Sequence, residues 1–178
     1  METLGIGPSI RRAQAVFLHK PGLAVHDDAP ATAQWDGGAR VVTRHDSGAQ
    51  FATDLPKELG GQGQDVTPGW MYRAGLAACA ATSVVMAAEA QGLALTSLEV
   101  RATSRSDARG LLGMSDAAGQ PYPAAPLAVG LWVRIAADGV AEQDLRALVA
   151  QALSHSPVPC LTTEVVPLSI AVDWVSAG

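Results

Sequence analysis

The strongest pattern in the chain is a long apolar stretch over residues 67–91, which predicts a single helix. Thr67 is a favourable N-cap, Pro68 suits the first helical position, and a glycine follows the last helical residue. Within the stretch only Arg73 and Glu89 are charged, and most other positions are small or apolar. A helix that is apolar almost all round is expected to be covered on most of its sides.

The part of the chain before this helix has short apolar runs separated by Gly- and Asp-rich turns, a pattern typical of an antiparallel meander. Its three predicted strands are residues 32–35, 39–43 and 50–53. Residues 1–12 are expected to form a loose or docked N-terminal arm, and residues 13–25 strand-like pieces broken by a Pro-Gly pair. The glycine-rich residues 59–65 lack the Lys-Ser/Thr end of a phosphate loop, so we expect a linker there.

The part after the long helix predicts further strands and one amphipathic helix. The predicted strands are residues 93–103, 127–136 and 165–175. Apolar residues recur at helical spacing over residues 140–155, and the prolines after Ser156 end that helix. Residues 107–122 are expected to be irregular because of their Gly and Pro content. The length of 178 residues suits a single domain over residues 1–178.

Charge and composition exclude several function classes. The net charge of −5 offers no basic face for phosphate neutralisation, which argues against a nucleic-acid partner. The four histidines form no metal-binding spacing, and we expect neither a metal nor a cofactor. No signal peptide is visible, and the most apolar window is mostly alanine and contains Glu89, so no membrane association is expected. These observations predict a soluble cytoplasmic protein.

The chain has two cysteines, and they are not arranged as a CxxC pair. Cys79 lies in the middle of the long helix, where it could be an inert core residue or a reactive thiol. A reactive thiol would need a cation or a hydrogen-bond donor from elsewhere in the fold, because Cys79 is too far from the helix N-terminus to gain from the dipole. Cys160 follows the proline-rich break, where it could meet Cys79 or be a buried loop residue.

The order of elements and three segments resemble the OsmC/Ohr family. The segments are TAQWDGG, ELGGQGQDVTPGWMYRAGLAACAA and SPVPCLTTEVVPLSIAV, and the resemblance covers roughly residues 30–175. The spacing from Thr67-Pro68 to Cys79 matches the family's Asn-Pro to Cys spacing without a gap. The resemblance implies an α+β fold, with antiparallel sheets wrapped around long central helices in an intertwined homodimer.

The same resemblance implies a thiol-dependent peroxidase that reduces organic or inorganic hydroperoxides in oxidative-stress defence. Cys79 would attack the peroxide, and Cys160 or an external thiol would resolve the product. A dithiol reductant would reopen a disulfide. Arg40 or Arg44 would stabilise the thiolate.

Two positions depart from the family pattern. Ser156 stands where the family has the resolving cysteine of a Cys-Pro-Val turn, and Gly69 stands where active peroxidases carry a glutamate. The alternative function is a non-catalytic OsmC-like binding protein. It would hold an apolar ligand in a dimer-interface pocket lined by Trp70, Tyr72 and Met86.

Overall fold

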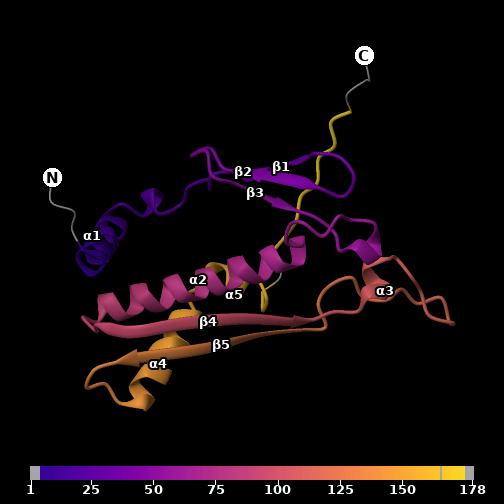
Figure 1. The fold of residues 1–178 in the computed structure, drawn as a ribbon. Coiled ribbons are helices and arrows are strands. Elements are labelled where there is room, and N and C mark those ends of the chain that lie inside the picture. The colour runs from indigo at the N-terminus through magenta and orange to yellow at the C-terminus, as the bar shows by residue number, and fades with distance from the viewer. Residues whose placement is uncertain (1–4, 165, 175–178) are drawn as a thin grey trace.

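The computed structural model describes residues 5–164 and 166–174. It is a mixed α+β fold with antiparallel sheets and a long central helix, α2 (Pro68–Ala90) (Figure 1). This helix packs along the two-stranded sheet of β4 (Leu95–Arg105) and β5 (Ala128–Ala137). The predicted long helix and the two predicted strands after it are therefore confirmed.

Helix α2 begins and ends where its sequence predicts. The hydroxyl of Thr67 accepts a hydrogen bond from the Trp70 amide at 3.2 Å, and Gly92 has a φ of 71° just beyond the helix. By length and composition α2 could cross a membrane, with a mean hydropathy of 1.3 over its most apolar window. One such helix is a weak sign, because the core helix of a soluble protein has the same properties.

The core of the single chain lies along α2, which packs on β4 and on α4 (Glu142–Leu153). Four residues of α2, one on each successive turn, are buried: Leu76, Ala80, Val84 and Ala88. The buried residues of α4 are Leu145, Leu148 and Ala152. The remaining surface of α2 is half-buried or exposed, so the single chain covers less of this helix than its composition predicts.

The predicted meander is confirmed as a three-stranded antiparallel sheet in the order β1-β2-β3. The strands are β1 (Thr32–Trp35), β2 (Val41–Arg44) and β3 (Gln50–Thr53), and a short 3₁₀ helix, η2 (Lys57–Leu59), follows. The β1–β2 turn contains Gly37 and Gly38, whose φ values of 96° and 56° favour glycine.

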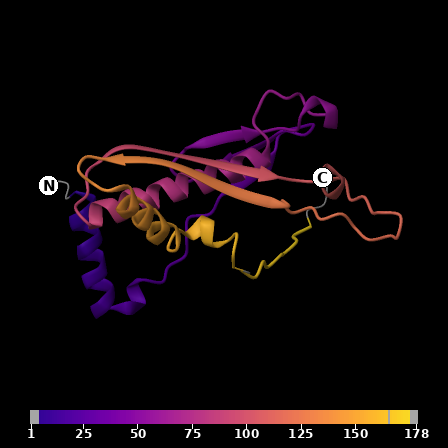
Figure 2. The same ribbon diagram turned by 90° about the horizontal axis from the view of Figure 1, so that it is seen from below.

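The prediction of strand-like pieces over residues 13–25 is wrong. These residues lie mostly in helix α1 (Ile6–His19) and in the 3₁₀ helix η1 (Pro21–Leu23). Pro8 is tolerated because it falls in the first turn of α1, and the helix ends before Pro21. Residues 5–12 of the expected arm are thus largely helical, while residues 1–4 lie outside the described residues. Figure 2 shows α1 at the end of the molecule where α2 terminates.

Two more corrections concern the C-terminal half. The segment expected to be irregular includes the short helix α3 (Ala108–Leu111), and the prolines that end α4 also begin α5 (Pro157–Cys160). Residues 166–174 of the last predicted strand form no strand in this chain, and positions 165 and 175 lie outside the described residues. The apolar side chains of this segment are largely exposed, because none of the described strands pairs with it.

Candidate functional site

Cys79 lies half-buried on the side of α2 that faces α5. Its Sγ is 3.3 Å from the Oγ of Ser156, and the backbone N–H of Val158 donates to it at 3.5 Å. Both partners come from the start of α5, because Pro157 turns the chain directly after α4. Two neutral hydrogen-bond groups therefore face the sulfur.

Ser156 is fully buried and links Cys79 to a second hydroxyl. The Oγ of Ser83 donates to the Oγ of Ser156 at 2.9 Å. Ser83 lies one turn after Cys79 on the same face of α2, so the helix itself sets this spacing. Because Ser156 accepts from Ser83, its own hydrogen remains available for the sulfur of Cys79.

Cys160 does not meet Cys79 in the structure, and both thiols are free. The Sγ of Cys160 lies 3.6 Å from the carbonyl oxygen of Ser154 and 4.0 Å from that of Leu153. It is therefore directed at the C-terminal end of α4. Of the two alternatives left open by the sequence, a contact between the two thiols is not seen among the described contacts.

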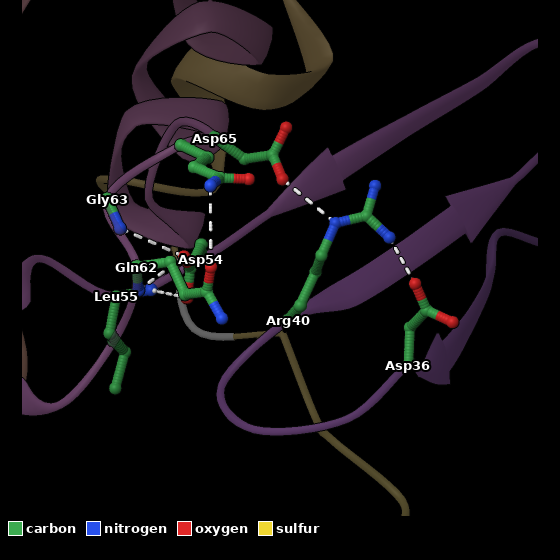
Figure 3. Close-up of polar contacts among 8 residues, drawn as sticks. Asp36, Arg40, Asp54, Leu55, Gln62, Gly63 and Asp65 are labelled. Carbon is green, nitrogen blue, oxygen red and sulfur yellow. Dashed lines mark hydrogen bonds and ion pairs between the residues drawn. The ribbon is translucent and has the colours of Figure 1, made fainter.

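Arg40 is held by two carboxylates rather than by a thiol (Figure 3). Its Nε donates to Asp65 at 3.0 Å, and its Nη1 forms an ion pair with Asp36. The hydrogen bond to Asp65, followed by that to Asp36, raises the pKa of Arg40 despite an opposing effect of burial. The alternative candidate, Arg44, donates to Gln34 at 3.1 Å.

A buried carboxylate next to Arg40 orders the glycine-rich loop (Figure 3). Asp54 accepts backbone hydrogen bonds from Leu55 at 2.7 Å, Gln62 at 2.8 Å and Gly63 at 3.0 Å. Burial raises the pKa of Asp54, but the combined backbone hydrogen bonds lower it below its ordinary value. Asp54 was not singled out from the sequence. The signal that could have found it is the pair of aspartates, Asp54 and Asp65, on either side of the glycine-rich segment.

The three residues expected to line an apolar pocket are all partly exposed, at 48% for Trp70, 40% for Tyr72 and 44% for Met86. Met86 and Ser83 line a hollow of about 450 Å³ between α1, α2 and α4. Trp70 and Tyr72 are not part of the lining of this hollow. Of the three residues predicted to line one pocket, the structure thus places only Met86 at this concave surface.

The glycine at the start of α2 leaves room for a side chain. A Cβ at Gly69 would meet Nη1 of Arg73 at 3.8 Å and Oγ1 of Thr67 at 4.0 Å, which are ordinary contacts. Arg73 donates to the hydroxyl of Ser104 at 3.1 Å. Within residues 5–164 and 166–174, no three His, Cys, Asp or Glu side chains gather as a metal site.

Comparison with known proteins matches residues 61–171, more than half of the chain, to the family of OsmC-like proteins. An OsmC-like protein from Mycoplasma pneumoniae has a similar solved structure, with a TM-score of 0.64 and 16% identity over 79% of this chain and 91% of that one. An organic hydroperoxide resistance protein OsmC from Legionella pneumophila gives a TM-score of 0.56 and 20% identity over 77% and 90%.

A third similar structure is that of an organic hydroperoxide resistance protein from Vibrio cholerae, with captopril bound in one of its active sites. It gives a TM-score of 0.52 and 21% identity over 78% of this chain and 87% of that one. No curated protein matches the sequence. These identities support the fold, and the family match confirms the expected resemblance: the chain belongs to the family of OsmC-like proteins.

Proposed function

We propose that the protein is a cysteine-dependent hydroperoxide reductase in which Cys79 is the attacking thiol. The observation that carries this proposal is the half-buried Cys79 sulfur with the Ser156 hydroxyl and the Val158 N–H directed at it. Cys79 also lies within the segment that matches the family. The naming of the Legionella and Vibrio relatives as organic hydroperoxide resistance proteins supports a hydroperoxide substrate.

In the proposed reaction the Cys79 thiolate attacks one peroxide oxygen. A sulfur–oxygen bond forms, the O–O bond breaks, and the departing alkoxide takes up a proton to become an alcohol. Two electrons pass from sulfur to the peroxide, and Cys79 becomes a sulfenic acid. The Ser156 hydroxyl and the Val158 amide hold the sulfur in place throughout, because both contact it directly.

Arg40 has no direct part in this step as long as Asp36 and Asp65 hold it. The proposed role of Arg40 at the thiolate therefore requires both ion pairs to open.

The proposal places the reaction in the cytoplasm and in a homodimer, in line with the expectations from the sequence. The incompletely covered α2 supports the homodimer.

The first prediction concerns the thiol itself. Replacement of Cys79 by Ser removes the nucleophile, so consumption of cumene hydroperoxide should fall by at least about 100-fold, to the background rate. The measurement is peroxide loss over time with an excess of a reducing thiol. Cys160→Ser is the matched control, because it removes the other thiol of the chain. Equal peroxide consumption by wild type and Cys79→Ser would refute the proposed function.

A second candidate function is non-catalytic binding of an apolar ligand. It is favoured by the hollow of about 450 Å³ at Met86 and by the absence of a cation on Cys79 among the described contacts. A Cys79 thiol that stays reduced in excess peroxide would favour this function over the first.

A further inference from the structure

The residue nearest to the sulfur of Cys79 determines how an oxidised Cys79 can be reduced. That residue is Ser156, whose hydroxyl is 3.3 Å away and fully buried. A hydroxyl cannot form a disulfide, so the side chain best placed to react with a sulfenic acid is chemically unable to do so. The buried Ser83–Ser156 hydrogen bond keeps this hydroxyl in position.

The other thiol of the chain, Cys160, has no described contact with Cys79. The N–H of Val158 faces Cys79, and Cys160 follows two residues later. The Sγ of Cys160 instead contacts the carbonyl oxygens of Leu153 and Ser154 at the end of α4. To reach Cys79, the sulfur of Cys160 would have to leave these carbonyl groups, next to the buried Pro159.

We propose that oxidised Cys79 is reduced by an external low-molecular-weight monothiol, in a one-cysteine cycle in which Ser156 positions the reacting sulfur. This inference rests on the proposed hydroperoxide reductase function. Cys79 is half-buried rather than fully buried in the single chain. The hollow of about 450 Å³ begins at Ser83 and Pro157, beside the hydroxyl pair, and is of a size that suits a small molecule.

The cycle balances with two equivalents of the monothiol. The first attacks the sulfenic sulfur, so that an S–S bond forms, the S–O bond breaks and the hydroxyl leaves as water after taking up a proton. The second attacks the external sulfur of this mixed disulfide, and Cys79 leaves as a thiolate. Overall, one hydroperoxide and two thiols give one alcohol, one water and one external disulfide. Ser156 can donate its hydrogen to the sulfenic oxygen, which makes it a positioning residue.

The test compares wild type, Cys160→Ser and Ser156→Cys after one equivalent of cumene hydroperoxide without reductant. Intact-mass and peptide analysis in the presence of dimedone should find the trapped sulfenic acid on Cys79 in wild type and in Cys160→Ser alike. Ser156→Cys should instead form a disulfide with Cys79, since the two side-chain atoms are already 3.3 Å apart.

Steady-state turnover gives a second readout. Free cysteine alone should support equal turnover in wild type and Cys160→Ser, with a rate that rises in proportion to its concentration. In Ser156→Cys the internal disulfide competes with the external thiol, and turnover on free cysteine should fall by about tenfold while dithiothreitol still supports it.

Two results would overturn the inference while leaving the proposed function intact: a Cys79–Cys160 disulfide in oxidised wild type, or loss of cysteine-supported turnover in Cys160→Ser. A Cys79 that stays reduced in peroxide would overturn both. If Ser156→Cys fails to fold, the comparison of wild type with Cys160→Ser still decides between the two routes.

Discussion

At the scale of single residues, Asp54 shows how one buried carboxylate can hold a loop beside another charged side chain, Arg40. It has no cation partner among its described contacts, and the backbone N–H groups of the glycine-rich loop satisfy its oxygens. Gly61 lets that loop close around it, since a Cβ at this position would lie 1.9 Å from the carbonyl oxygen of Leu55. The loop also carries Asp65, one of the two carboxylates that hold Arg40.

We expect the stability of the protein to fall on acidification partly because of Asp54. Its pKa in the folded chain lies below the ordinary value of 3.8. The stabilisation is therefore fully present above about pH 4 and is lost as the pH falls through the folded pKa. Urea unfolding of wild type and Asp54→Asn at pH 7 and pH 3 measures this.

The difference between the two proteins should be largest at pH 7 and smaller at pH 3. Asp107, whose pKa the side chain of Arg109 lowers to about 2, acts in the same direction. Because it is present in both proteins, its contribution cancels in the comparison. A stability difference that is independent of pH would rule out a role for the charge of Asp54.

At the scale of elements, local signals predicted α2 and the meander well, and failed where a distant partner decides the conformation. Thr67, Pro68 and Gly92 mark the ends of α2 in the sequence itself. Helix α1 was missed because its apolar residues also fit short strands, and only its packing on α2 decides between the two. Gly7 permits that packing, since a Cβ there would lie 2.5 Å from the carbonyl oxygen of Glu89.

The candidate site was likewise predicted from the sequence only in part. Helical spacing is enough to place Ser83 on the same face as Cys79, and the family resemblance singled out Cys79. The contact of both with Ser156 depends on the reversal of the chain between α4 and α5, which spacing does not encode. The direction of Cys160 depends on the same turn.

The core along α2 should be sensitive to loss of volume. Leu76 is 1% exposed, so Leu76→Ala should lower the free energy of unfolding by about 2–5 kcal/mol through lost burial and the cavity left behind. Chemical denaturation followed by circular dichroism measures the change. Gln143→Ala, at an exposed position of α4, should change the stability by no more than about 0.5 kcal/mol. Equal effects of the two changes would contradict the assigned core.

At the scale of the whole molecule, two of the uncovered apolar surfaces suggest contact with another chain. The first is the exposed side of α2, with Tyr72, Ala78 and Met86. The second is the C-terminal segment, where alternate residues are 78–86% exposed: Leu168, Ile170, Val172 and Trp174. Monomeric proteins rarely expose contiguous apolar surface of this kind, so a second copy of the chain is the cover that we propose.

The corresponding prediction is a dimer in solution. Sedimentation equilibrium should give twice the mass of the 18.3 kDa chain for wild type. Ala78→Arg places a charge on the exposed side of α2 and should shift the protein toward the monomer by at least about tenfold in the dissociation constant. Gln143→Arg adds the same charge to α4 and serves as the control. A wild-type monomer at micromolar concentration would contradict the proposed assembly.

The hydroxyl beside Cys79 has a consequence for the lifetime of the proposed sulfenic acid after a reaction with peroxide. In the proposed cycle, a neighbouring thiol would react with the sulfenic acid at once, whereas Ser156 would leave the sulfenic acid in place until an external thiol reaches it. During that delay a second peroxide can carry the sulfur irreversibly to the sulfinic acid. The time for which the protein stays active under oxidant would then depend on the ratio of thiol to peroxide around it. Depletion of the thiol would inactivate the protein irreversibly.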